Sequence, residues 1–353
     1  MSPLRVGWVL VLAALCLAAG IAGGFELRAL TSPAPGTPSS VLSITAAGTL
    51  ATLFPEVGRA LANVTPGVSA PAASEQFEGS LAALSAISSL HEPFDVAAAA
   101  DFRLIPSMLE PTDASWEVVF ATTPEVLCYD PSVPAFTGIN STNWAEKVVA
   151  PGVLLGVANQ STDPNGYNGI FTLELEGQLE NGSLSSLYSH FYMTPVGGWA
   201  EPSPTTTRVE PETQVATLLS THVVSAFITY RSYAVSHQLS FVTLDPRVGL
   251  GATDAADVAA YAAASTTILG ASGPDRVTGA PVLFAVTVPL NAPDPGLGNA
   301  FVEFLFSPAG ASLIAANGFS PVSPGWADRT GALPLPITTD AVALPGSLQA
   351  LLP

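Results

Sequence analysis

The chain has 353 residues, 48% of them hydrophobic, and carries 28 acidic residues against 10 basic ones, a formal net charge of −18. A chain longer than about 250–300 residues normally divides its hydrophobic core, so we expect two lobes. The strong negative charge, with Lys147 as the sole lysine, disfavours nucleic acid and anionic membrane surfaces as partners.

The first 24 residues have the features of a targeting segment. Arg5 precedes an uncharged apolar run from Val6 to Ala22. Such a run is typical of a signal peptide or an N-terminal membrane anchor, its length leaves both open, and Cys16 within it leaves lipidation open as well. Residues 25–40 follow as a Pro/Ser/Thr-rich linker. We therefore expect an exported, extracytoplasmic protein at the cell surface, attached to the membrane through its N-terminal segment.

Strand and helix patterns alternate through the folded part, which begins at Val41. This alternation is typical of an α/β fold with parallel strands. Residues 177–207 are polar and rich in Gly, Ser and Pro, and they predict a loop. The predicted strands span 41–45, 95–99, 118–120, 126–129 and 282–288, and the predicted helices cover the apolar positions 50–61, 81–90, 103–109, 300–306 and 311–316.

We place the two crossings between the lobes at 121–124 and near 239–244. Lobe 1 would then combine residues 41–122 with 243–353, and lobe 2 would contain 123–242. Two discontinuous α/β lobes joined by crossing strands form a hinged clamp that holds its ligand in the cleft.

The motifs of common exported enzymes are absent from the sequence. It contains no G-x-S-x-G elbow, no H-E-x-x-H motif and no P-loop. Cys128 is the one cysteine of the folded part, so we expect a buried strand thiol and neither an intrachain disulfide nor a Cys-based metal site. The four histidines, His91, His190, His222 and His237, are not spaced along the sequence as the ligands of a metal site are. We expect no enzyme activity and no cofactor.

Four Asn-x-Ser/Thr sequons begin at Asn63, Asn140, Asn159 and Asn181. In an exported protein, a glycan at such a site would help to solubilise a surface with few charges. Chance occurrence in a Ser/Thr-rich chain explains the tripeptides as well, and Asn140 belongs to the segment INSTNW, which we interpret as structural. Glycosylation of the four sequons therefore stays open.

Two glycine-containing turns in lobe 1 have the composition of an anion site. They are Ala47-Gly48-Thr49 and Glu78-Gly79-Ser80, each with a glycine that allows close backbone approach and a hydroxyl at a helix start. Backbone N–H groups at such turns bind anions without a basic side chain, so the negative net charge does not exclude an anionic ligand. On pattern alone, ordinary N-capping by the hydroxyls is the favoured interpretation.

Three segments occur in an unusual combination: ADFRLIPSMLEP from Ala100, INSTNW from Ile139 and DPNGY from Asp163. In this order they resemble archaeal-type tungstate/molybdate-binding proteins, the extracytoplasmic receptors of ABC importers. The resemblance covers most of residues 41–325. It implies a type II periplasmic-binding-protein fold and a monomeric carrier that delivers tungstate or molybdate to an ABC permease.

The resemblance also implies a ligand site. Two carboxylates would bind the central metal atom, which expands from tetrahedral to octahedral coordination in a way that sulfate and phosphate cannot imitate. Hydroxyl groups would bind the oxygens. The implied metal-binding residues are Asp163 and Glu212, with Glu210 as the alternative to Glu212, and the implied oxyanion donors are Thr49, Ser80 and Tyr230.

Several positions depart from the family's pattern. Thr49 replaces a serine, Phe102 a tyrosine and Asn165 a cysteine. These departures leave two alternatives open: a receptor for another small anion such as sulfate or phosphate, and a surface or adhesion protein that has lost ligand binding.

Overall fold

The computed structural model describes residues 40–65, 68–69, 75–179, 186–270 and 273–353. Val41–Pro353 forms one compact unit. The predicted targeting segment, the linker up to residue 39 and the sequon at Asn181 lie outside the described residues.

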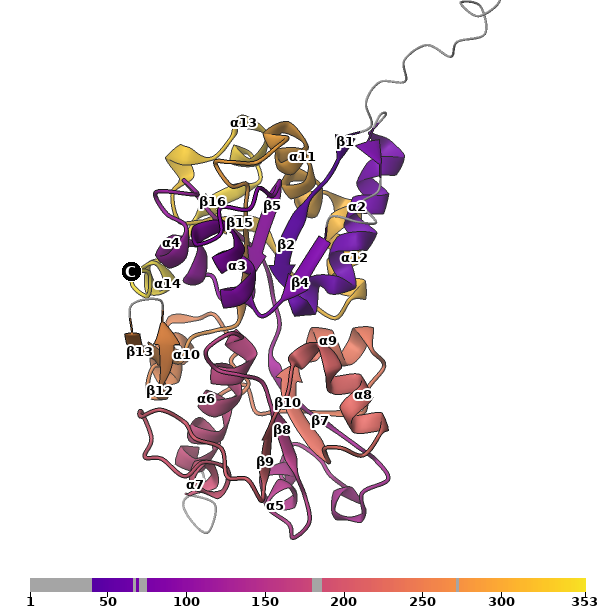
Figure 1. Cartoon of the computed structure of the whole chain (residues 1–353), viewed down its shortest axis with the longest axis vertical. Helices are drawn as coiled ribbons and strands as arrows, with labels where there is room; N and C mark the ends of the chain where they lie inside the picture. Colours follow the sequence, from indigo (N-terminus) through magenta and orange to yellow (C-terminus); the bar gives the residue numbers. More distant parts are fainter. Residues whose placement is uncertain (1–39, 66–67, 70–74, 180–185, 271–272) are drawn as a thin grey trace, which may run out of the picture. The chain divides into compact units, whose positions relative to one another are not determined.

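A mixed sheet of seven strands forms one half of this unit, in the order β16-β15-β6-β14-β5-β2-β4 (Figure 1). β2 pairs in parallel with β4 and β5, whereas β14 lies antiparallel between β5 and β6. The predicted parallel arrangement therefore holds for part of this sheet, which also contains the parallel pair β15–β16 and the antiparallel pair β6–β15. The strands are β2 (Ile44–Ala47), β4 (Glu75–Glu78), β5 (Val96–Ala99), β6 (Val118–Thr122), β14 (Leu283–Thr287), β15 (Ser320–Ala327) and β16 (Ala341–Ala343).

A second sheet has five strands in the order β11-β7-β10-β8-β9. β6 ends at Thr122 in the first sheet and β7 begins at Glu125 in the second, so two residues carry the chain between them. We call the first sheet with its helices lobe 1 and the second lobe 2; the exact lobe boundaries stay a prediction. The strands of lobe 2 are β7 (Glu125–Tyr129), β8 (Leu155–Val157), β9 (Thr207–Val209), β10 (Ala226–Tyr230) and β11 (Phe241–Thr243).

The return path to lobe 1 is longer than the first crossing. After β11 the chain forms α10 (Ala255–Tyr261) and the antiparallel pair β12 (Ser265–Gly270) and β13 (Gly273–Thr278) before it enters β14. The Ser265 N–H donates a hydrogen bond to Glu174 of helix α6 (Pro164–Leu179) in lobe 2, at 2.9 Å. The β12–β13 pair is therefore held against lobe 2 although the chain continues into lobe 1.

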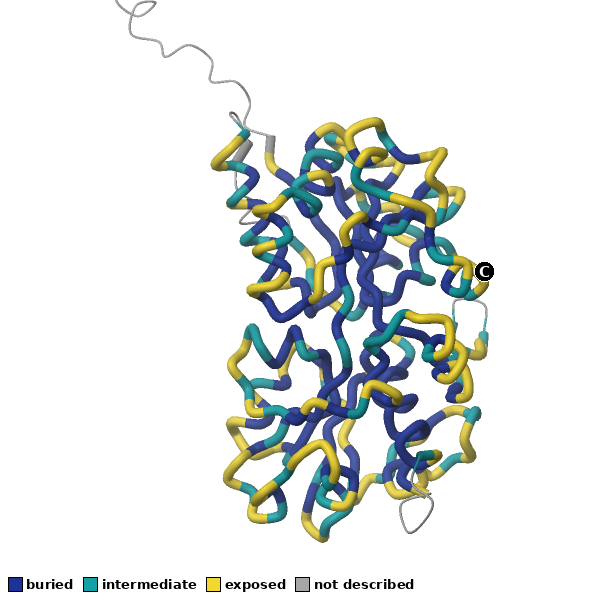
Figure 2. The backbone as a smooth tube through the Cα atoms, turned by 180° about the vertical axis from the view of Figure 1, so that it is seen from behind, coloured by how far each residue is buried: buried dark blue, intermediate teal, exposed yellow. Residues whose placement is uncertain are grey.

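Helices cover both faces of the lobe 1 sheet because its strands alternate between two cores. Ala98 and Val286 belong to the core that includes α2 and α11, whereas the adjacent Ala97 and Ala285 belong to the core of α3 and α4. Figure 2 shows the strands of both sheets as buried segments between more exposed helices. The lobe 1 helices are η1 (Gly48–Ala51), α2 (Leu53–Val64), α3 (Ser80–Ser88), α4 (Leu104–Met108), α11 (Pro295–Phe306), α12 (Pro308–Ala316), η4 (Thr330–Ala332), α13 (Leu335–Thr338) and α14 (Gly346–Gln349).

In lobe 2 the long helix α6 runs beside the sheet (Figure 1). The lobe 2 helices are η2 (Pro134–Phe136), α5 (Trp144–Val148), α6 (Pro164–Leu179), α7 (Leu187–Phe191), η3 (Glu212–Gln214), α8 (Val215–Ser220) and α9 (Arg231–Ser236). The two-residue strands β1 (Ser40–Val41) and β3 (Val68–Ser69) pair with each other beside α2 of lobe 1.

Two local predictions are wrong. α3 ends at Ser88, so Leu90, predicted on its apolar face, lies beyond the helix and is 67% exposed. α7 interrupts the predicted loop 177–207, because Leu187 and Phe191 are buried and their burial stabilises a helix that local composition disfavours.

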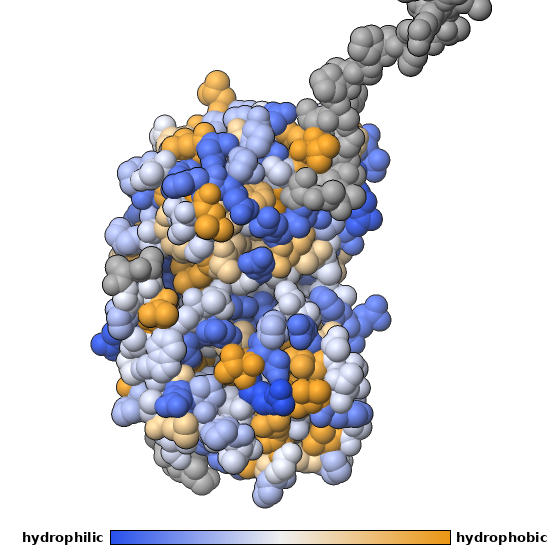
Figure 3. Space-filling model, viewed as in Figure 1, coloured by the Kyte–Doolittle hydropathy of each residue, from blue (hydrophilic) through white to orange (hydrophobic). Residues whose placement is uncertain are grey.

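The surface mixes residue types. On the face shown in Figure 3, apolar residues are interspersed with hydrophilic ones over both lobes. Among the described residues, no single helix is long and apolar enough to cross a membrane; α11 and α12, bent by 72° at their junction, meet that test of length and composition only as a pair.

Replacing Phe301 by alanine should lower the free energy of unfolding by about 3–5 kcal/mol. The Phe301 ring is fully buried on α11 and meets the Phe54 ring edge to face, with 5.0 Å between centroids. Leu335→Ala is the control: this side chain is 87% exposed, and its loss should change stability by less than about 0.5 kcal/mol. Urea unfolding measures both variants, and equal effects would contradict this description of the core.

Candidate functional site

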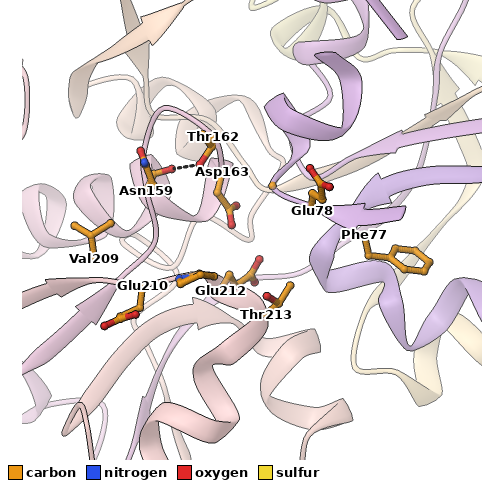
Figure 4. Close-up of a pocket in the computed structure, with 11 residues that line it drawn as sticks. Phe77, Glu78, Asn159, Thr162, Asp163, Val209, Glu210, Glu212 and Thr213 are labelled. Atoms are coloured by element: carbon orange, nitrogen blue, oxygen red, sulfur yellow. Dashed lines mark hydrogen bonds between the residues drawn. The ribbon is translucent and has the colours of Figure 1, made fainter. Parts of the chain in front are cut away.

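A pocket of about 450 Å³ lies between the lobes (Figure 4). Four of its eleven described lining residues are acidic and none is basic. The pocket is therefore rich in acidic side chains, although the resemblance predicts an anionic ligand. Lobe 1 contributes Phe77, Glu78 and Gly79, and lobe 2 contributes Asn159, Thr162, Asp163, Val209, Glu210, Pro211, Glu212 and Thr213.

The Asp163 and Glu212 carboxylates face the same space in this pocket (Figure 4). Asp163 immediately precedes α6, and its Oδ1 accepts a hydrogen bond from the Asn165 N–H at 3.0 Å. Glu212 is the first residue of η3. The Glu210 carboxylate points away from Asp163 and pairs with Arg208 at 2.7 Å. The geometry thus brings Glu212, rather than Glu210, opposite Asp163.

Thr49 joins the lobes through Glu212. Its hydroxyl, in η1 of lobe 1, donates to both Glu212 carboxylate oxygens at 3.0 and 3.1 Å, and the Thr229 hydroxyl donates to one of them at 3.1 Å. Thr49 is the second residue of η1, whose N-cap residue is Ala47, so its side chain does not occupy the capping position. N-capping, the interpretation favoured by the turn pattern, is therefore wrong at Thr49.

Ser80 and Tyr230 are buried and are not among the described residues that line the pocket. Ser80 Oγ makes no capping bond to α3 and instead accepts a hydrogen bond from the Ala100 N–H at 3.0 Å. The Tyr230 hydroxyl accepts one from the Asn168 amide at 3.3 Å. Because each hydroxyl is an acceptor in the bond described, its own hydrogen stays available for donation.

Burial and mutual repulsion change the acidity of the facing carboxyls. Burial raises the pKa of Asp163 to about 7, against the opposing effect of the Asn165 N–H. Burial, and then the charge of Asp163, raise the pKa of Glu212, while the Thr49 and Thr229 hydroxyls lower it. Two acids in this arrangement are stabilised by a shared proton or by an electropositive centre between them.

Glu125, the first residue of β7, is a buried acid that the sequence interpretation missed. It lies directly opposite Tyr230 in the β7–β10 ladder, so the two side chains share one face of the sheet. Neither Glu125 carboxyl oxygen has a hydrogen-bond partner among the described residues. Burial raises its pKa, followed by the charges of Glu212 and Asp163. The signal in the sequence was an acid at the start of a strand that is otherwise apolar.

Two glycines allow the lobes to approach one another. A Cβ added at Gly79 would lie 2.2 Å from the Thr162 carbonyl oxygen, and one at Gly48 would lie 2.7 Å from the Thr213 Cγ2. Backbone cannot move aside as a flexible side chain can, so the Gly79 contact is the stricter of the two. Glycine is thus required at Gly79 by the close approach of lobe 2.

A second set of contacts joins the lobes away from the carboxylates. The Tyr167 hydroxyl of α6 donates to Asp101 Oδ2 at 2.7 Å. Asp101 forms an ion pair with Arg103 at 2.6 Å, and the Arg103 guanidinium donates to the Thr278 carbonyl at 2.9 Å. All three side chains are largely buried, so this network stabilises the arrangement in which the lobes touch.

The chain matches the family model described as bacterial extracellular solute-binding protein over residues 42–320. An uncharacterized solute-binding protein of Methanoculleus marisnigri is 31% identical over 259 residues, which cover 70% of this chain and 72% of the relative. The molybdate/tungstate-binding protein WtpA of Thermococcus kodakarensis is 26% identical over 256 residues, covering 69% and 71% of the two chains.

Solved structures share the fold. The periplasmic molybdate-binding protein of Azotobacter vinelandii superposes with a TM-score of 0.55 at 12% identity, over 79% of this chain and 98% of that one. The sulfate-binding protein SubI of Mycobacterium tuberculosis superposes with a TM-score of 0.53, also at 12% identity, over 80% and 87%. At this identity the likeness shows the type II periplasmic-binding-protein fold, as the sequence predicted, and no ligand.

Gly79→Ala should favour the open arrangement of the lobes. The backbone at Gly79 has φ −59°, which alanine adopts without strain, so the fold of lobe 1 should be unaffected. The added methyl group meets the Thr162 carbonyl only when the lobes touch. Small-angle scattering of the ligand-free protein should show a larger radius of gyration than wild type. Gly346→Ala, where a Cβ meets nothing within 4 Å, is the control, and unchanged scattering at both positions would refute the role of Gly79.

Asp163→Asn should stabilise the ligand-free protein, and more so as the pH rises. The pKa of Asp163 is raised to about 7 in the folded state, so the carboxyl is neutral in the folded protein at low pH. As the pH rises towards 7, the unfolded chain loses this proton more readily than the folded protein, and the free energy of unfolding of the wild type falls. Asparagine keeps the acceptor for the Asn165 N–H without the charge. We expect a gain on the order of 2–4 kcal/mol at pH 8 and little at pH 4, measured by urea unfolding.

The control for this variant is Asp254→Asn, the same change at the exposed N-cap of α10. Hydrogen bonds from Asp257 lower the pKa of Asp254, so this variant should show no gain at pH 8. A pH-independent effect of Asp163→Asn would show that the carboxyl is not forced towards its neutral form.

Proposed function

The chain belongs to the bacterial extracellular solute-binding protein family, the extracytoplasmic receptors of ABC importers, and we propose that it captures tungstate or molybdate through Asp163 and Glu212. Proteins of this family bind their solute and release it to a permease without transforming it. We further propose that this chain acts as a monomer, needs no resident cofactor and is attached to the membrane by its N-terminal segment.

The observation that carries the proposal is the facing pair of buried carboxyls at a contact between the lobes. Thr49 of lobe 1 already donates to Glu212 of lobe 2, so a group bound at the carboxylates would contact both lobes. A ligand stabilises closure only to the extent that it prefers the closed state, and contacts on both sides provide that preference.

The acidic character of the pocket favours an oxyanion whose central atom accepts carboxylate oxygens. Sulfate and phosphate present only oxygens, which two carboxylates repel unless a proton intervenes. Tungsten and molybdenum accept further oxygen ligands, so in their oxyanions the same carboxylates would become ligands. The 26% identical relative named as a molybdate/tungstate-binding protein supports this choice.

The neutral hydroxyls complete the proposed site. In this proposal Thr49, Ser80 and Tyr230 donate to the oxyanion oxygens, which requires Thr49 to release Glu212 or share its hydrogen. Ser80 and Tyr230 each have a hydroxyl hydrogen not used in the bonds described above. A modest rotation of these side chains on closure around the ligand would direct those hydrogens into the pocket.

The amide variants Asp163→Asn and Glu212→Gln separate coordination from repulsion. If the carboxylates bind the metal atom, each amide should weaken tungstate binding by at least about 100-fold, or about 2.7 kcal/mol. If they only repel the anion, removing their charge should strengthen binding. Titration calorimetry of wild type and both variants with tungstate and molybdate distinguishes these outcomes.

Glu210→Gln is the matched control, because Glu210 lines the same pocket but points away from Asp163. It should leave the affinity within about threefold of wild type. Titration of the wild type with sulfate and phosphate tests the alternatives. Binding of either one instead of tungstate would show that it is the ligand, whereas binding of none of the four anions would favour a surface or adhesion role.

A further inference from the structure

The sequon at Asn140 forms a closed turn at the surface of lobe 2. Asn140 is exposed between η2 and α5. Its Oδ1 accepts a hydrogen bond from the Thr142 N–H at 2.9 Å and another from the Thr142 hydroxyl at 2.7 Å. The two residue types that define the sequon, the asparagine and the hydroxyl residue two positions later, therefore contact each other directly.

The side-chain nitrogen of Asn140 is not needed to hold this turn. Its Nδ2 lies 3.4 Å from the Gly138 carbonyl oxygen, the outer limit of a hydrogen bond. That oxygen already accepts a shorter bond from the Asn143 amide, at 3.1 Å, and Asn143 Oδ1 accepts from the Asn140 N–H at 2.8 Å. Asn143 thus maintains the loop, and substitution at Asn140 Nδ2 would cost one long hydrogen bond.

Of the other sequons, those at Asn159 and Asn63 lie in the part of the chain that the structure describes. Asn159 Oδ1 also accepts a hydrogen bond from the N–H two residues later, that of Ser161, at 2.9 Å, but no bond from the Ser161 hydroxyl to it is found among the described residues. The hydroxyl of Ser161, which belongs to the Asn159 sequon, accepts a hydrogen bond from the Leu269 N–H at 2.9 Å, and Asn159 lines the pocket. Asn63 lies in the last turn of α2, where the backbone is helical. A glycan at Asn159 would stand in the ligand pocket, whereas α5, which follows Asn140, lies at the end of lobe 2 remote from lobe 1 (Figure 1).

We propose that Asn140 is an N-glycosylation site of the exported protein. The donor is an oligosaccharide linked through its anomeric carbon to a lipid diphosphate. Asn140 Nδ2 forms a bond to that carbon, the anomeric C–O bond breaks, the lipid diphosphate leaves and Nδ2 loses one proton. Because Thr142 holds Oδ1, Nδ2 gives up only its long hydrogen bond to the Gly138 carbonyl in this transfer. A hydrophilic glycan there would solubilise a chain in which only 11% of residues are charged.

The test is glycopeptide mass spectrometry of the protein purified from its native host. We expect a glycan on the peptide that contains Asn140 and an unmodified Asn159. Thr142→Ser, which keeps the hydroxyl, should retain the glycan. Thr142→Ala, which keeps Asn140 but removes the hydroxyl, should abolish it, and Asn140→Gln should reduce the intact mass by the whole glycan. Thermal melting checks that each variant is folded.

Ligand affinity provides a second readout, since the site lies outside the pocket. Asn140→Gln should bind tungstate within about twofold of wild type, so failure of the proposed ligand would not affect the glycan result. An unmodified Asn140 in the host-derived protein, a glycan on Asn159 in its place, or a glycan that persists in Thr142→Ala would each overturn the assignment.

Discussion

The burial of Asp163 and Glu212 beside one pocket, with Thr49 of lobe 1 bound to Glu212 of lobe 2, is the constraint on which the site depends. Two acidic side chains, each almost entirely buried, face one pocket without any basic lining residue beside them. Such a pair is costly to fold unless protons or a ligand offset the repulsion. The surrounding structure keeps the pair in place with neutral donors: Thr49 and Thr229 bind Glu212, and the start of α6 binds Asp163. The two carboxyls are thus arranged to bind an electropositive group, and we propose that this group is the central atom of an oxyanion.

The two-sheet architecture follows from this need for access. The backbone crosses from β6 to β7 in two residues, and the groups of the proposed site come mainly from turns and helix starts, such as Thr49 in η1, Asp163 before α6 and Glu212 in η3. Such positions combine exposed backbone donors with freedom to move as the lobes separate. Glu125 begins β7 directly after this crossing and lies opposite Tyr230 in the ladder, and the charges of Glu212 and Asp163 help to raise its pKa.

Much of the fold could be predicted from periodicity. The buried strands at 95–99 and 282–288 and the helix pair near 300–316 correspond to β5, β14, α11 and α12, because their apolar patterns are strong and local. α7 could not be found in this way, since its stability depends on burial by distant residues. The antiparallel direction of β14 depends on the route of the chain through lobe 2, which no local pattern records. Within the proposed site, Asp163 and Glu212 were predicted by resemblance, whereas Glu125 lacked a motif and required the strand register.

The network of Tyr167, Asp101 and Arg103 has a consequence for transport. It joins the lobes without using any residue that lines the carboxylate pocket, so its stabilising effect does not depend on whether the pocket is filled. Contacts of this kind raise the share of empty molecules that are closed, and they lower the amount of ligand binding energy that closure requires. A permease that recognises the closed form would then meet more receptors without cargo. The same three side chains therefore increase the affinity for ligand and, at the same time, reduce the difference between empty and loaded receptors that the permease could recognise.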